Sequence, residues 1–115
     1  MSILSIEVKR VSEGMAHVKV VGSLDAATYE KMEKEIDKLF ANSYYKLIVH
    51  LEQVQYISSA GAGVFISAIG TAQDHNGNIV LLKPSAQVKD VFTTLGLAEI
   101  FPYADTIDEA VRSFS

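Results

Sequence analysis

Two adjacent serines, Ser58 and Ser59, stand directly before four of the smallest side chains in proteins: Ala60, Gly61, Ala62 and Gly63. A serine in the first turn of a helix commonly caps it, because its hydroxyl accepts a hydrogen bond from an unpaired backbone N–H and stabilises the helix by about 1 kcal/mol. The same position favours anions, since free N–H groups and the helix dipole point at it. A phosphoserine, with about 1.5 to 2 negative charges, would be tolerated there. The stretch therefore predicts a helix start whose serine is either a cap or a phosphorylation switch.

The small residues after the serines have two compatible uses. They let the start of a helix lie close to a sheet, and Gly70 continues the same face. They also leave the backbone open to an enzyme that must reach a serine hydroxyl, at a cost of about 1 kcal/mol of helix propensity per glycine.

The hydrophobic pattern before the serines predicts a hairpin, a helix and a buried strand. Residues 5–11 and 16–21 alternate polar and apolar positions, as in two antiparallel strands. Asp25 is the expected N-cap of the helix. Residues 45–51 are apolar and β-prone, as in a strand buried on both faces, and residues 52–57 are expected to form a loop. The apolar positions with helical spacing are Tyr29, Met32, Ile36, Leu39 and Phe40.

The pattern after the serines predicts three helices and two strands. The first helix starts at Ser58 or Ser59, runs to about His75 and leaves through Asn76 and Gly77. A strand follows at residues 78–82, then a helix that ends at Gly96 and a short strand at 98–101. Thr106 and Glu109 have the spacing of a capping box for a last helix.

Alternation of strands and helices after a hairpin predicts an α/β fold. We expect one domain over residues 1–115, with an N-terminal β-hairpin leading into a mostly parallel mixed sheet of about five strands packed with about four helices. The loops after parallel strands emerge at one edge of such a sheet. The turns at residues 22–25 and 57–61 should therefore be neighbours, and that edge is the candidate site.

Composition narrows the class of protein. The chain has 115 residues, 49% of them hydrophobic and 21% charged, which suits one compact unit with a real core. A formal charge of −4 and a pI near 5.2 give no electrostatic footprint for nucleic acid. There is no cysteine, and no apolar stretch has the length of a membrane span. We expect a cytoplasmic protein that binds neither nucleic acid nor membrane.

Enzyme motifs are incomplete in this sequence. The residues around Ser59 lack the first glycine of the G-x-S-x-G nucleophile elbow. The glycines that follow lack the third glycine of a dinucleotide fingerprint, and there is no phosphate loop. His17, His50 and His75 are far apart, without the paired spacing of metal ligands. The sequence thus favours a protein that is not an enzyme and uses no cofactor or metal.

Three segments resemble one family when they are taken together. They are GSLDAAT at residues 22–28, VQYISSAGAGVFI at 54–66 and TTLGLAEIFPYADTIDEAV at 93–111. They resemble the anti-sigma factor antagonists, whose STAS domain also occurs at the ends of sulphate transporters. The likeness covers essentially the whole chain, and its most specific part is G-x-L-D-x-x-T paired with the later S-S-A-G block.

The resemblance implies a partner switch. In this family the unmodified antagonist binds an anti-sigma factor that is itself a serine kinase, and so frees a sigma factor for transcription. Phosphorylation by that kinase breaks the complex, and a metal-dependent serine phosphatase restores it. By position the acceptor serine is Ser59, and the family's aspartate and threonine are Asp25 and Thr28. A monomer or weak dimer is expected. The docking face implied around the acceptor comprises Asp25, Thr28, Ser58, Ala60, Gly61, Ala62 and Gly63.

Three positions depart from the family pattern. Ser58 stands where many members carry aspartate, which makes it a rival acceptor. His50 stands where aspartate or asparagine is frequent, and Ala62 replaces a larger apolar residue, so the docking surface is expected to be shallower.

Other functions stay open at this point. The chain could be a scaffold subunit of a larger stress-signalling assembly, with the same edge packed against copies of itself. It could regulate a target other than a sigma factor through a related kinase and phosphatase. A small hydrolase or ligand carrier that uses Ser58 or Ser59 is the third alternative.

Overall fold

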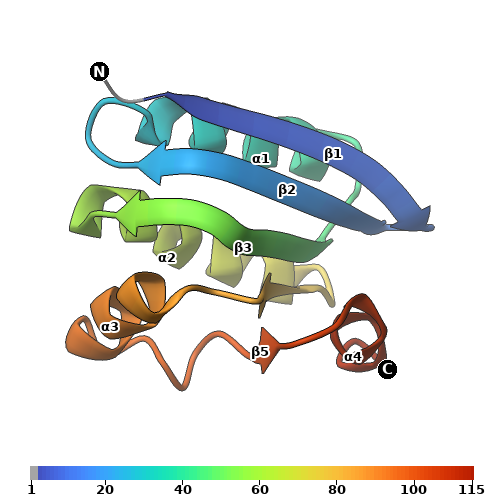
Figure 1. The fold of residues 1–115 in the computed structure, drawn as a ribbon. Coiled ribbons are helices and arrows are strands. Elements are labelled where there is room, and N and C mark those ends of the chain that lie inside the picture. The colour runs from blue at the N-terminus through green and yellow to red at the C-terminus, as the bar shows by residue number, and fades with distance from the viewer. Residues whose placement is uncertain (1–2) are drawn as a thin grey trace.

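A computed structural model describes residues 3–115, and Figure 1 shows its strands in one sheet. The strands lie in the order β1-β2-β3-β4-β5. β1 pairs with β2 antiparallel, and the later neighbours pair in parallel. The predicted hairpin and mostly parallel mixed sheet are confirmed. The strands are β1 (Leu4–Ser12), β2 (Met15–Leu24), β3 (Lys46–Ile57), β4 (Asn78–Leu82) and β5 (Tyr103–Ala104).

The helices cover the two faces of the sheet unequally. α1 and α2 lie side by side behind the sheet in Figure 1. The main core lies between the sheet and α1, α2 and α3, where Met32, Phe65 and Phe92 are fully buried. α4 covers part of the opposite face through a smaller cluster around Ile48 and Ala110. The helices are α1 (Tyr29–Ala41), α2 (Ser59–Asp74), α3 (Ala86–Thr94) and α4 (Ile107–Arg112).

Two predictions around the candidate site are wrong. Asp25 is not the N-cap of α1, because the amides of Thr28 and Tyr29 both donate to the Asp25 carbonyl and form a separate turn, after which Thr28 takes the N-cap position. Residues 52–57 are not a loop. β2 continues to Leu24 and offers a pairing partner for the end of β3, so the strand runs on to Ile57.

The last predicted strand is also misplaced. Residues 98–100 form a turn, and the apolar side chains of Leu97 and Phe101 on either side of it are buried in the main core. Pairing with β4 begins only at Tyr103. The other late elements are confirmed, including the Thr106 cap, whose hydroxyl accepts a hydrogen bond from the Glu109 amide at 3.1 Å. Within residues 3–115, no helix combines the length and the apolar character that crossing a membrane requires.

Candidate functional site

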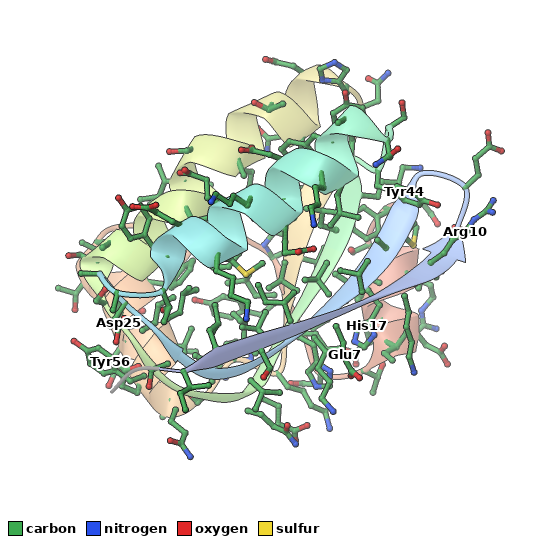
Figure 2. The ribbon with its side chains drawn as sticks, turned by 90° about the horizontal axis from the view of Figure 1, so that it is seen from above. Glu7, Arg10, His17, Asp25, Tyr44 and Tyr56 are labelled. Carbon is green, nitrogen blue, oxygen red and sulfur yellow. The ribbon has the colours of Figure 1, made fainter. Side chains whose placement is uncertain are left out.

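The carboxyl ends of β2 and β3 meet at one edge of the sheet. Leu24 pairs with Ile57, and the amide of Ser58 donates to the Leu24 carbonyl at 2.9 Å. Figure 2 shows Asp25 and Tyr56 together at this edge, below the start of the helices. The predicted neighbourhood of the two turns is confirmed.

The structure gives the two serines different roles. Ser58 is the N-cap of α2, and its Oγ accepts a hydrogen bond from the Gly61 amide at 3.2 Å. Ser59 is the first residue of the helix, it is exposed, and its hydroxyl makes no hydrogen bond to the described residues. The first N–H groups of a helix have no partner within it, so the Ser59 side chain stands beside free donors. Ser58 therefore stabilises the helix, and the Ser59 hydroxyl remains accessible to solvent.

Gly61 sets how closely α2 approaches the end of β2. A Cβ atom added there would lie 2.4 Å from the Leu24 carbonyl oxygen, far inside van der Waals contact. The same addition at Gly63 or Gly70 would meet open space. The expected close approach is therefore confirmed for Gly61 and wrong for Gly63 and Gly70, because these two face away from the sheet.

The turn at residues 25–28 is held by Thr28. Its hydroxyl accepts a hydrogen bond from the Asp25 amide at 3.0 Å and donates to the Ser23 carbonyl at 2.8 Å. The Asp25 carboxylate accepts a hydrogen bond from the Ala27 amide at 2.9 Å and stays half-exposed. Thr28 itself is only 8% exposed, so it shapes the turn from within.

The predicted docking residues therefore separate into two groups. Thr28, Gly61 and Ala62 are buried, and they position the edge without presenting a side chain to a partner. The residues with solvent-accessible atoms are Asp25, Ser58, Ser59, Ala60 and Gly63.

A hollow that the sequence did not reveal lies next to the serines. The β3–α3 hollow has a volume of about 320 Å³ and is lined by the end of β3, by Ser58 and Ser59, and by one side of α3. Tyr56 and Leu95 at its rim are 48% and 41% exposed. The sequence signal that could have pointed to this surface is the large aromatic residue Tyr56, two positions before Ser58.

Gln87 ties the two walls of the hollow together. Its Oε1 accepts a hydrogen bond from the Ile57 amide at 2.9 Å, and its Nε2 donates to the Ile57 carbonyl at 3.1 Å. The Gln87 carboxamide thus satisfies the backbone N–H and C=O of Ile57, as a neighbouring strand would. No local sequence pattern predicts this contact, because Gln87 and Ile57 are 30 positions apart.

His50, the unexplained departure from the family pattern, pairs with His17 on the sheet face opposite α1 and α2. The facing nitrogens, His17 Nε2 and His50 Nδ1, are 3.2 Å apart, and His50 Nε2 lies 3.3 Å from a Glu52 carboxylate oxygen. Figure 2 shows His17 and Glu7 projecting from this face, away from the edge with Asp25. Across residues 3–115, no cluster of three or more metal-binding side chains occurs.

The site therefore offers an accessible hydroxyl at a helix N-terminus, free backbone donors beside it and a preformed hollow. The donors and the helix dipole favour a dianion on that hydroxyl. Among the described residues, no side chain makes a hydrogen bond to the Ser59 hydroxyl that could activate it as a nucleophile.

Comparison with known proteins gives a consistent picture. The family model described as STAS domain matches residues 7–110. BtrV of Bordetella bronchiseptica is 28% identical over 102 residues, which cover 89% of this chain and 88% of the relative. The anti-sigma-B factor antagonist of Listeria monocytogenes is 28% identical over 97 residues, covering 84% of this chain and 85% of that protein.

Solved structures share the fold along nearly the whole chain. The unphosphorylated anti-sigma factor antagonist SpoIIAA superimposes with a TM-score of 0.82 at 23% identity and covers 95% of both chains. The phosphorylated form of the Bacillus cell fate determinant SpoIIAA superimposes with a TM-score of 0.75 at 22% identity, over 96% of this chain and 100% of the other.

Proposed function

This chain belongs to the STAS domain family, and we propose that it is an anti-sigma factor antagonist whose hold on its partner is switched by phosphorylation of Ser59. A curated relative carries the name anti-sigma-B factor antagonist, and the similar SpoIIAA has structures in unphosphorylated and phosphorylated forms. The protein acts in this proposal by binding, in the cytoplasm, and without a cofactor.

One observation carries the proposal: Ser59 is an exposed, unbonded hydroxyl at the first position of α2. Its neighbour Ser58 is half-buried, and its Oγ is engaged as the cap by the Gly61 amide, so its hydroxyl is less accessible to a kinase than that of Ser59. This difference favours Ser59 over Ser58 as the acceptor.

A phosphate on Ser59 suits the local electrostatics of α2. The free N–H groups and the dipole of a 16-residue helix stabilise an anion at its N-terminus by roughly 0.3 to 1 kcal/mol at an exposed position. The added charge changes the surface that a partner meets while the buried contacts of Gly61 and Thr28 stay as they are. Modification thus alters binding without requiring another fold.

The partner in this proposal is an anti-sigma factor with serine kinase activity. The unmodified protein binds the kinase through the edge that carries Ser59, and so releases a sigma factor. Transfer of phosphate to Ser59 ends the binding, and a metal-dependent serine phosphatase reverses the modification. The protein itself is a monomer or weak dimer, which leaves this edge accessible.

The test is phosphorylation by the cognate kinase with ATP, followed by mass spectrometry. We expect one phosphate on Ser59, no phosphate on Ser59→Ala, and uptake at Ser59 in the matched variant Ser58→Ala. In a binding assay, Ser59→Asp should weaken the complex, whereas Ser59→Ala should retain it. Phosphate on Ser58 alone, or equal binding by Ser59→Asp and Ser59→Ala, would contradict the proposal.

A further inference from the structure

The β3–α3 hollow has features that point to a specific kind of occupant. Its walls are fixed before any partner arrives, because the two hydrogen bonds between Gln87 and Ile57 hold α3 against the end of β3. Ile57 is fully buried, so the floor cannot move without disturbing the main core. A preformed cavity costs little to occupy, since no part of it has to be ordered on binding.

The rim of the hollow is apolar. Tyr56 is 48% exposed on one side and Leu95 is 41% exposed on the other, with the half-buried Val91 between α3 and the core. An apolar side chain placed here would remove this surface from water and gain the free energy of that burial. Apolar and aromatic anchors in such pockets carry most of the energy of many protein interfaces.

One charged side chain faces the same hollow. Asp90 is exposed on α3, and it is the only charged residue among the described residues that line the cavity. It forms no ion pair with the described residues. The adjacent Lys89 points elsewhere, over the ring of Tyr103, with its Nζ 5.8 Å from the ring centroid. The Asp90 carboxylate is therefore accessible to a cation of a binding partner.

Two of the polar side chains that line the hollow are already engaged in hydrogen bonds. The Gln87 carboxamide is bound to Ile57 at both ends, and the Ser58 hydroxyl is bound to Gly61. Small-molecule sites depend on a few such convergent groups. The cavity still offers apolar surface, a single acid and the hydroxyls of Ser59 and Thr94. Exposed apolar surface beside one acid suits a protein segment that carries an apolar side chain and a cation.

We propose that the β3–α3 hollow is the anchor pocket for the partner, and that it takes an apolar side chain of the partner next to a lysine or arginine that pairs with Asp90. This inference rests on the proposed function and specifies the chemistry of the docking segment. The apolar side chain supplies affinity through burial, and the cation supplies orientation and rate of encounter.

The position of the pocket connects anchoring with the switch. Ser59 lines the same hollow from the α2 side, whereas Asp90 lies on the α3 side. A phosphate on Ser59 has to keep its hydration, because burying an ionised group without a partner is costly. An apolar side chain seated beside it would strip that hydration. Phosphorylation therefore disfavours the seated anchor.

The experiment measures the affinity of the cognate kinase for unphosphorylated variants by titration calorimetry at two salt concentrations. We expect Leu95→Ala to weaken binding by about tenfold, as for an interface anchor. Asp90→Lys should weaken it by at least about tenfold and Asp90→Asn by less, with a smaller salt dependence in both. The matched control is Asp74→Asn, which removes the same charge at the far end of α2 and should bind as the unmodified chain does.

The outcomes separate this inference from the proposed function. If the kinase phosphorylates Ser59 and binds all of these variants equally, the anchor pocket is overturned while the switch stands. If Asp90→Lys recovers its affinity with a partner whose basic residue is reversed to glutamate, the pairing is established. A concentration-dependent dimer that Leu95→Ala abolishes would place a second copy of this chain in the hollow and overturn the inference. Thermal unfolding of each variant confirms that it is folded.

Discussion

The carboxyl edge of the sheet and the sheet face opposite α1 and α2 both carry polar side chains, but their hydrogen bonding differs. At the edge, Ser59 is exposed and unbonded, and Asp90 on the neighbouring helix has no ion pair with the described residues. On the opposite face, His17 bonds to His50, His50 contacts Glu52, and Glu52 lies 3.8 Å from Lys83.

The difference separates polar groups that serve the fold from the groups that the proposed function assigns to a partner. Partly buried polar atoms that stabilise a fold find partners within it, as the histidine pair does. The edge instead uses the buried Thr28 and the half-buried Gln87 to hold a surface on which the Ser59 hydroxyl makes no hydrogen bond to the described residues. Hydrogen-bonded groups of the fold thus support the exposed groups of the edge, which is the arrangement that favours binding.

The largest expected effect tests the rigidity of the edge. Gly61→Ala would place a methyl group 2.4 Å from the Leu24 carbonyl oxygen and 2.9 Å from the Leu24 side chain, so α2 must shift away from the end of β2. We expect the free energy of unfolding to fall by about 1 to 3 kcal/mol. Urea denaturation measures the change.

Gly70→Ala is the control in the same helix. A Cβ there meets nothing within 4 Å, so the substitution should stabilise the protein by about 1 kcal/mol through helix propensity alone. Equal effects of the two substitutions would show that α2 does not depend on close contact at Gly61.

The second prediction concerns the link between the walls of the hollow. Gln87→Ala removes both hydrogen bonds to Ile57 and leaves a buried amide without a partner, which should cost about 1 to 2 kcal/mol. Hydrogen exchange at the Ile57 amide should accelerate more than exchange in β1. If the Ile57 amide remained fully protected, another group would be holding the edge.

Much of this architecture follows from local sequence patterns. β4 has the predicted bounds, and Ser58 caps α2 as one of the two expected serines. The adjacency of the turns follows from parallel pairing alone. These features succeed because propensity, hydrophobic period and capping chemistry act over a few neighbouring residues.

Most of the failures depend on partners that are distant in the sequence. Residues 52–57 read as a loop, yet the extended end of β2 pairs with them. Asp25 is the exception, because its failure is local: the amides of Thr28 and Tyr29 donate to its carbonyl and form a separate turn before α1. The Gln87 contact and the pairing of His17 with His50, 33 positions apart, have no local signature. Tertiary contacts override local preference at these positions.

A third prediction separates the adjacent serines by stability. Ser58→Ala should lower the free energy of unfolding by about 1 kcal/mol, because the Gly61 amide loses its cap. Ser59→Ala should change it by no more than about 0.5 kcal/mol, as for an exposed side chain without a partner. Thermal melts of the two variants provide the comparison. A larger loss for Ser59→Ala would reverse the roles assigned to these residues.

The smallest expected effect lies on the opposite face and depends on pH. Burial first, and then the charges of His50, Lys9 and Lys19, lower the pKa of His17 below its ordinary 6.5, with Glu7 acting weakly in the other direction. The unfolded chain therefore binds more protons than the folded protein once the pH falls below about 6.5. We expect stability to decrease as the pH drops from 6.5 through the lowered pKa of His17, and to be unaffected by this group at higher pH.

His17→Gln removes this titration and should flatten the fall of the melting temperature as the pH drops from 6.5 through the lowered pKa of His17. His75→Gln is the control. His75 stacks on Tyr45, with ring centroids 4.0 Å apart, so its substitution leaves the pair of His17 and His50 intact. An unchanged slope in His17→Gln would show that the histidine pair is not tied into the fold. The phosphorylation of Ser59 should not respond to either substitution, because His17 lies away from the edge that carries Asp25 and Tyr56 (Figure 2).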